Sequence, residues 1–159
     1  MGKNRSGEVV LILHNVRSAH NVGSILRTAE GAGVSKVYLT GYTPALTDRF
    51  GRMRMDIAKA SLGAEHLMVV EHVANVSPLI NQLKQEGFHM VAVEQDSRAR
   101  SFKIFTPRAK TVYLFGNEVR GISKALRNQA DAIIDIPMRG KKESLNVSVA
   151  VGVILFNAR

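Results

Sequence analysis

The stretch IPMRGKKESLNVSVAVGVILFNAR, residues 136–159, joins a basic loop to a long apolar run through two polar residues. Pro137 ends the short apolar strand before it, because proline has no N–H to give to a neighbouring strand. Ser144 and Asn146 then stand where the loop enters the apolar run. Free backbone N–H groups at such a junction can hold an anion or the polar edge of a ligand. The stretch therefore combines features of a binding site with those of a buried element.

The apolar run that follows admits two interpretations. Valine occupies every second position from 147 to 153, and strict alternation of this kind is typical of a strand. The run from 144 to 158 contains no turn signal, however, and is longer than the usual strand of roughly 4–8 residues. Its length favours a buried helix with Ser144 near the N-cap. In that helix Ser148 and Gly152 lie four residues apart and form a small face on which a partner helix can pack closely.

The charge of the chain indicates a polyanionic partner. There are 22 Lys and Arg residues against 13 Asp and Glu, a net charge of +9. Such an excess in a small domain points most often to nucleic acid, the alternative being a generally basic protein without that role. Many of the basic residues cluster in candidate loops. With three Tyr, six Phe and no Trp, the chain is not expected to present a surface of stacking aromatic rings.

Several classes of protein are excluded or disfavoured by composition. The absence of cysteine excludes disulfides, thiolate metal sites and cysteine nucleophiles, and fits a cytoplasmic location. The five histidines lack metal-ligand spacing, so no metal is expected. No apolar run is long enough for a transmembrane helix, and no membrane association is expected.

Strands and helices alternate along the whole chain. Short apolar runs predict strands at 9–13, 36–40, 67–71, 88–93, 111–115 and 132–136, and helical patterns predict helices at 22–32, 52–60, 76–85, 123–128 and over the closing run. This order predicts one α/β domain with a mostly parallel sheet flanked by helices. Ligands of such sheets bind beyond the carboxyl ends of the strands, which here carry the loops 15–21, 94–100, 116–121 and 137–146.

The first two of the polar constellations follow the first and fifth strands. In NVRSAHNVGSILR, residues 15–27, Asn21 is a fair N-cap, Gly23 permits close approach, and Arg27 lies in the helix that follows. A phosphate partner would suit Arg27, although a solvated residue or a pair with Glu30 is an equal alternative. In GNEVRG, residues 116–121, the spacing is neither a dinucleotide fingerprint nor a phosphate loop. Glu118 there repels phosphates and suits hydroxyl groups or amines, unless it is part of a surface turn.

Three stretches together resemble the motifs of the SpoU (TrmH-like) RNA 2′-O-ribose methyltransferases of the SPOUT superfamily. They are NVRSAHNVGSILRTAEGAG, LFGNEVRGIS and IPMRGKKESLNVSVAVGVILFNA, and they occur in the family's order over nearly the whole chain. The resemblance implies S-adenosylmethionine as methyl donor and a ribose 2′-hydroxyl of tRNA or rRNA as acceptor. It also implies a homodimer and a deep C-terminal trefoil knot, which general rules of chain topology disfavour. Many relatives carry an additional RNA-binding domain, whereas residues 1–159 are expected to form a single methyltransferase domain without one.

The resemblance also implies roles for individual residues. By motif position Asn21, Arg27, Glu118, Ser144 and Asn146 correspond to the family's active-site residues. The family's proton-accepting role falls on Arg27, but a guanidinium is effectively always charged, so binding of phosphate and stabilisation of the developing alkoxide fit it better.

The remaining predicted contacts fall into two groups. The cofactor is expected on Val93, Glu94, Leu114, Phe115, Gly116, Ile136, Pro137, Met138 and Leu145. RNA is expected on Arg17, His20, Arg49, Arg52, Arg139, Lys141 and Lys142. One alternative is a non-catalytic basic RNA-binding protein of the same fold, but the presence of Arg27 and Asn146 favours an enzyme. Another is a nucleotide-dependent oxidoreductase, whose glycine fingerprint is missing after the first strand.

Overall fold

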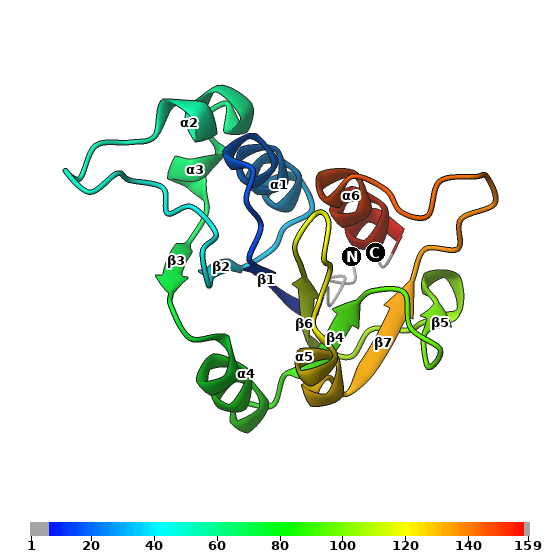
Figure 1. Ribbon diagram of the computed structural model, residues 1–159. Coiled ribbons are helices and arrows are strands. Elements are labelled where there is room, and N and C mark those ends of the chain that lie inside the picture. Colours follow the sequence, from blue (N-terminus) through cyan, green and yellow to red (C-terminus); the bar gives the residue numbers. More distant parts are fainter. Residues whose placement is uncertain (1–6, 158–159) are drawn as a thin grey trace, which may run out of the picture.

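Strand β1 (Glu8–His14) lies in the interior of the sheet because both of its faces are apolar. Val9, Leu11 and Leu13 belong to one hydrophobic core, and Val10 and Ile12 to a second core on the opposite face. A strand that is apolar on both faces is typical of a parallel sheet covered by helices on both sides. The computed structural model describes residues 7–157, and Figure 1 shows this layered arrangement.

All strand pairs of the seven-stranded sheet are parallel, in the order β3-β2-β1-β6-β4-β7-β5. The other strands are β2 (Lys36–Thr40), β3 (Val70–Val73), β4 (His89–Val93), β5 (Arg100–Ser101), β6 (Lys110–Phe115) and β7 (Ala132–Asp135). The predicted α/β class is therefore confirmed.

The helices divide between the two faces of the sheet. One core contains buried residues of α1 (Ala19–Gly31), α2 (Met55–Ser61), α3 (Ala64–Leu67) and α6 (Val147–Asn157). The other contains buried residues of α4 (Val76–Gln85) and α5 (Lys124–Gln129). A short 3-10 helix, η1 (Phe102–Ile104), follows β5.

Several predicted boundaries are wrong, each for a local reason. The third strand begins at Val70, because residues 64–67 form α3 instead. Helix α1 begins earlier than predicted, since Ser18 and not Asn21 is its N-cap: the Ser18 hydroxyl accepts a hydrogen bond from the Asn21 N–H at 3.1 Å. The two-residue strand β5 has no periodic pattern in the sequence and was not predicted.

The closing run is helical, as its length predicted, but its N-terminus is capped by a different residue. The Asn146 side-chain oxygen accepts hydrogen bonds from the Ser148 N–H at 2.8 Å and the Ser148 hydroxyl at 2.6 Å. Ser144 lies outside the helix, in the preceding loop. The predicted end of the helix at residue 158 lies outside the described residues, and the threading of this helix through a knot stays a prediction.

No helix within residues 7–157 is long and apolar enough to cross a membrane. The loops that follow β1, β4, β6 and β7 all leave the same edge of the sheet, as parallel strands require.

Candidate functional site at the carboxyl edge of the sheet

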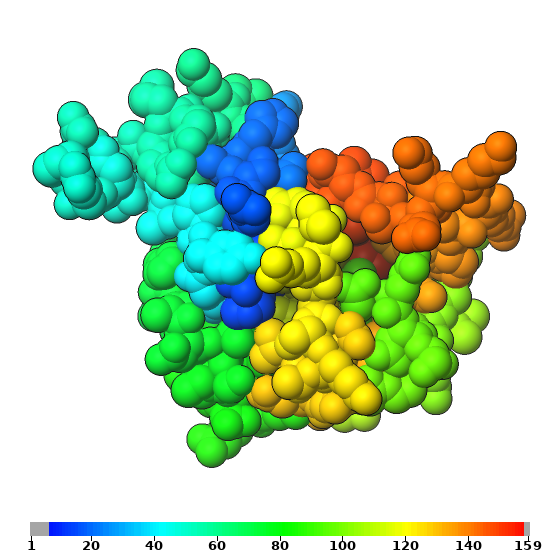
Figure 2. All heavy atoms as spheres, in the orientation of Figure 1, coloured from blue at the N-terminus to red at the C-terminus, as the bar shows by residue number. Residues whose placement is uncertain are grey.

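A cavity lies where the loops that follow β4, β6 and β7 meet the N-terminal part of α6. Figure 2 shows the hollow between the 116–121 loop and the 137–146 loop. Its walls combine apolar side chains with three carboxyl-bearing residues. The lining residues are Val93, Glu94, Gln95, Phe115, Gly116, Asn117, Glu118, Val119, Arg120, Gly121, Asp135, Ile136, Met138, Ser144, Leu145, Val147 and Ala150.

The 116–121 loop is folded tightly by two glycines and one asparagine. A Cβ on Gly116 would lie 2.6 Å from the Gly121 backbone, and a Cβ on Gly121 would lie 2.0 Å from Oε2 of Glu94. Gly121 also has a φ of +63°, a conformation that glycine adopts most easily. The Glu94 carboxylate accepts a hydrogen bond from the Ile122 N–H at 2.8 Å and so joins the loop after β4 to this one.

Asn117 is the organising side chain of this loop, and sequence reasoning did not assign it a role. Its side-chain oxygen accepts hydrogen bonds from the Val119 and Arg120 N–H groups at 2.9 and 2.8 Å. Its amide nitrogen donates to the Asn15 carbonyl at 3.0 Å and to the Tyr42 hydroxyl at 3.2 Å. An asparagine in a glycine-flanked turn two residues after an apolar strand, where its side chain can accept from the N–H groups two and three residues on, is the signal that could have identified it.

Glu118 connects this loop to the start of α1. Its carboxylate accepts hydrogen bonds from the N–H groups of Arg17 and Ser18, both at 3.1 Å, and from the Asn21 amide at 3.2 Å. Burial raises the pKa of the Glu118 carboxyl, but these donors outweigh burial and hold the pKa below its usual value. The carboxylate also lies at a helix N-terminus, where negative charge is favourable. Glu118 is therefore charged at neutral pH and already occupied by protein donors.

A chain of hydrogen bonds extends from Glu118 to the closing helix. Asn21 is 7% exposed, and its side-chain oxygen accepts a hydrogen bond from the Asn146 amide at 3.3 Å. The three motifs are thus linked in the order Glu118–Asn21–Asn146, although the residues are about a hundred positions apart in the chain. Ser144 lines the cavity and lies two residues before Asn146 in the sequence.

The structure brings most of the predicted cofactor contacts to the cavity. Leu114 and Pro137 do not line it: Leu114 is fully buried in the core on the α4 face, and Pro137 is exposed. The other seven do, namely Val93, Glu94, Phe115, Gly116, Ile136, Met138 and Leu145. Sequence reasoning missed Gln95, whose side-chain amide donates to the Glu143 carbonyl and so holds the basic loop against the loop after β4.

Arg27 lies apart from the cavity. It is exposed on α1, beyond the middle of the helix, and borders a separate depression with Ala60 of α2 and Phe156 of α6. Among residues 7–157 no side chain forms an ion pair with it, so the alternative pairing with Glu30 is not made. Within one copy of the chain, Arg27 therefore does not join the other four predicted catalytic residues.

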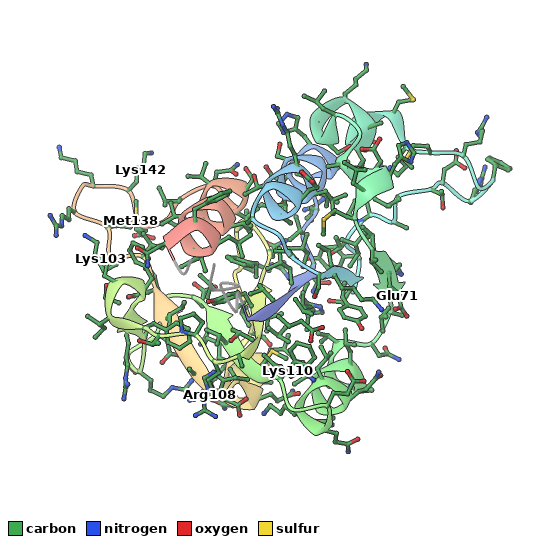
Figure 3. The ribbon with its side chains drawn as sticks, turned by 180° about the vertical axis from the view of Figure 1, so that it is seen from behind. Glu71, Lys103, Arg108, Lys110, Met138 and Lys142 are labelled. Atoms are coloured by element: carbon green, nitrogen blue, oxygen red, sulfur yellow. The ribbon has the colours of Figure 1, made fainter. Side chains whose placement is uncertain are left out.

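The predicted RNA-contacting residues are all exposed but occupy three places. Arg17 and His20 lie at the start of α1, and Arg139, Lys141 and Lys142 lie on the loop that borders the cavity. Figure 3 shows Lys142 on the same side as Lys103 and Met138, while Arg108 and Lys110 lie at the other end of the molecule. Arg49 and Arg52 lie on a projecting hairpin between β2 and α2. The positive charge is thus not gathered in one patch.

Among the described residues, no group of three or more His, Asp or Glu side chains is placed to hold a metal ion.

Comparison with known proteins identifies the family. The sequence model of the SpoU rRNA methylase family matches residues 8–156. The chain belongs to this family. It is 33% identical over 150 residues to the 23S rRNA (guanosine-2′-O-)-methyltransferase RlmB of Xanthomonas axonopodis pv. citri, covering 94% of this chain and 57% of that protein.

Solved structures of SpoU relatives have the same fold. The A. aeolicus TrmH/SpoU tRNA modifying enzyme aligns with a TM-score of 0.83 at 30% identity, over 97% of this chain and 75% of that one. The AdoMet-bound rRNA methyltransferase of Sinorhizobium meliloti aligns with a TM-score of 0.85 at 32% identity, over 96% of this chain and 56% of that one. This chain spans roughly three fifths of the length of the curated relatives that it matches.

Proposed function

We propose that this SpoU-family chain is an S-adenosylmethionine-dependent methyltransferase that modifies a ribose 2′-hydroxyl of tRNA or rRNA. The observation that carries the proposal is the cavity at the carboxyl edge of the sheet. The second and third motifs line it, and the first motif is joined to them through the hydrogen bonds of Asn21 with Glu118 and Asn146. The names of the relatives, an rRNA 2′-O-methyltransferase and an AdoMet-bound rRNA methyltransferase, support the same activity.

The lining of the cavity fits S-adenosylmethionine better than a dinucleotide. Glu94, Glu118 and Asp135 contribute carboxyl groups to the lining, which repel phosphates but suit hydroxyl groups, amines and a sulfonium. Apolar side chains, among them Ile136 and Leu145, offer a surface for an adenine ring. When bound, the cofactor supplies an electrophilic methyl group.

The polar residues have distinct tasks in this proposal. Asn21 and Asn146 hold each other and Glu118 in a fixed chain, so they orient the wall of the cavity toward the ribose. Glu118 positions the 116–121 loop, because its three hydrogen bonds to the start of α1 leave it little capacity to act as a base. Ser144 lines the cavity and binds either substrate or cofactor through its hydroxyl. Fixed donors of this kind lower the free energy of a transition state without reorganising.

The chain works as a homodimer in this proposal. Val149 and Phe156 of α6 are 51% and 59% exposed, and with Val153 between them they form an apolar stripe at helical spacing. Gly31 of α1 lies beside Phe156, so the stripe continues onto the first helix. A second copy offers the same surface and can cover the stripe through a two-fold contact. Arg27 borders that surface and not its own cavity, which supports a role for Arg27 in the site of the second subunit.

Cofactor binding and methyl transfer test the proposal directly. Calorimetry should show binding of S-adenosylmethionine and none of NAD. Incubation with radiolabelled cofactor and total tRNA or rRNA should then give label that survives alkaline hydrolysis as a ribose-methylated dinucleotide. Binding of cofactor without transfer to any RNA would favour the alternative, a non-catalytic RNA-binding protein of the same fold.

Mixed dimers test the assignment of Arg27 across the interface. Arg27→Ala and Gly121→Glu should each be inactive, the second because a side chain at position 121 meets the Glu94 carboxylate beside the cavity. If Arg27 acts in the partner's site, an equal mixture forms hybrid dimers with one complete site, and roughly a quarter of the activity returns. If the mixture stays inactive although the subunits exchange, Arg27 does not act across the interface.

Arg27→Ala should leave affinity for S-adenosylmethionine within several fold in the same preparations, because the residue does not line the cavity.

We further propose that the protein works in the cytoplasm, where RNA and S-adenosylmethionine are both available.

A further inference from the structure

The segment between β2 and α2 ends in a small hairpin, residues 47–53, that projects from the body of the molecule. Figures 1 and 2 show it as the cyan extension beyond α2, at the opposite end of this view from the hollow between the 116–121 and 137–146 loops. Thr47 and Met53 form an antiparallel bridge at its base. The hairpin does not contribute to the lining of the cavity, so the proposed methyltransferase site does not explain it.

The hairpin is held in one shape by Asp48. Its carboxylate accepts hydrogen bonds from the N–H groups of Phe50 and Arg52 at 2.8 and 3.0 Å and from Nε of Arg52 at 3.1 Å. The Asp48 carbonyl accepts a further bond from the Gly51 N–H at 3.0 Å, and Gly51 adopts a φ of +76°. A solvent-exposed loop tip with this many internal bonds presents its remaining side chains in a defined arrangement.

The side chain presented at the tip is Phe50, which is 66% exposed. The guanidinium carbons of Arg49 and Arg52 lie 4.8 and 5.0 Å from the centre of its ring. Phe50 belongs to neither hydrophobic core, so its ring is not needed to bury apolar surface in the fold. Arg49 forms no ion pair with any of residues 7–157, and its charge is free for a ligand.

We propose that the 47–53 hairpin is a second RNA-binding site, in which Arg49 moves from the Phe50 ring to a phosphate and an unpaired base stacks on the ring, while Arg52 stays paired with Asp48 and adds positive charge beside it. The inference rests on the proposed function, because it assumes an RNA substrate. An aromatic ring flanked by cations combines the two interactions by which proteins hold single-stranded nucleic acid. The bases of a regular duplex are already stacked on one another, so the site selects a loop, bulge or end of the RNA.

A protein partner fits this tip less well. Protein interfaces bury a contiguous apolar core of several hundred Å² per partner. Here a single exposed ring lies beside two arginines, on the projection that Figure 2 shows. Composition predicted no surface of stacking aromatic rings, and a single ring at one projecting position is not such a surface.

A tryptophan at position 50 makes the contact observable, because the chain contains no other tryptophan. Binding of a short single-stranded oligouridine should quench the fluorescence of Phe50→Trp, and a duplex of the same length should quench it much less. Leu67→Trp is the matched control: Leu67 is 73% exposed, lies on α3, which contains no Lys or Arg, and should show little quenching. Equal quenching of both tryptophans, or of both RNA forms, would overturn the proposal.

Affinity measurements separate stacking from charge. Phe50→Ala should weaken binding of the oligouridine by roughly 5- to 30-fold, and should change binding of the duplex by less than about twofold. Phe50→Trp keeps an aromatic ring and should retain binding of the single strand. Arg49→Gln should weaken both forms and lower the dependence on salt.

These outcomes also separate the hairpin from the methyltransferase proposal. If Phe50→Ala binds oligouridine like the unaltered protein while cofactor binding and methyl transfer are intact, the hairpin site is refuted and the proposed function stands. If the unaltered protein binds cofactor but no RNA of either form, both proposals are refuted.

Discussion

Asn21→Asp is the sharpest test of the hydrogen-bond chain that links the motifs. The substitution keeps the size and shape of the side chain but replaces the amide nitrogen, 3.2 Å from Oε1 of Glu118, with a charged oxygen. Two carboxylates then face each other at a position that is 7% exposed in the unaltered protein. The hydrogen bond from Asn21 to Glu118 is lost and is replaced by repulsion.

The size of the effect follows from that distance. At an effective dielectric constant of about 20, two charges separated by about 4 Å repel each other by about 4 kcal/mol. The cost cannot greatly exceed the free energy of protonating one of the two carboxyl groups, which is also about 4 kcal/mol at pH 7 for a group with an ordinary pKa near 4. Negative charge near the N-terminus of α1 is favourable by about 0.3–1 kcal/mol, which offsets part of this repulsion. We therefore expect Asn21→Asp to lower the free energy of unfolding by roughly 2–4 kcal/mol at pH 7.

The loss should depend on pH with a definite sign. In the folded variant the pair of carboxyl groups holds one proton more tightly than the unfolded chain does, so the folded-state pKa of the pair is raised. The destabilisation is then absent below the unfolded pKa, near 4, and grows by about 1.4 kcal/mol per pH unit until the raised pKa is reached. The difference between variant and unaltered protein should therefore shrink as the pH falls from 7 toward 4.

Urea denaturation of the variant and the unaltered protein at a series of pH values measures this difference. Asn21→Ala removes the amide without adding charge and should cost about 1–3 kcal/mol with little dependence on pH. Asn81→Asp, on the exposed face of α4, should change stability by less than about 0.5 kcal/mol. An Asn21→Asp variant as stable as the unaltered protein at pH 7 would refute the contact with Glu118.

Three other substitutions probe the cavity wall, the basic loop and the helix seam. Gly121→Ala should weaken S-adenosylmethionine binding at least tenfold in calorimetry, because the added Cβ meets Glu94. Gly51→Ala is the control: Gly51 has a similar positive φ but open space around it, so the substitution should lower the free energy of unfolding by only about 1–2 kcal/mol. Replacing the Arg and Lys residues of the 137–146 loop by Gln should lower the slope of log affinity against log salt by up to about 2–3, and an unchanged slope would mean that RNA binds elsewhere. Gly152 packs near Thr28 of α1 in the same chain and precedes Val153 of the exposed stripe. Gly152→Glu should therefore disturb the contact between α1 and α6 that carries the proposed dimer surface, and give monomer or aggregate with little activity in sedimentation and transfer assays. A fully active monomer would contradict the proposed dimer.

Apart from α3, η1 and the two-residue β5, the order of strands and helices could be predicted from the sequence because each depends on neighbouring residues. The apolar runs at β1 and β6 are long enough to identify buried strands, and the run at α6 exceeds the length of a strand. The cap of α6 could not be assigned in the same way. Ser144 and Asn146 are both good capping residues, and only the path of the loop decides that the Asn146 oxygen meets the Ser148 N–H.

The site itself was predictable only in part. The convergence of the strand-exit loops follows from the parallel sheet, but the contact between Glu118 and Asn21 joins residues that no local pattern relates. Arg27 illustrates the opposite case. Six residues at about 100° each place it roughly 120° around the helix from Asn21, so the two cannot face one cavity in the same chain. Motif order groups residues by function, whereas helix geometry decides which of them can face one cavity.

The distribution of charge indicates why a strongly basic protein keeps carboxylates at its centre. Glu94 and Glu118 are held by backbone N–H groups of neighbouring loops, so these charges are needed for the shape of the cavity and do not depend on a ligand. Arg120 lines the cavity, but most of the other exposed guanidinium and ammonium groups lie outside it, among them those on the 137–146 loop, at the start of α1 and on the 47–53 hairpin. In the proposed function, phosphates are attracted to the periphery and repelled from the interior. The ribose can then approach the cavity while the RNA backbone stays on the surface, and one domain can bind a cationic cofactor and a polyanionic substrate without a conflict of charge.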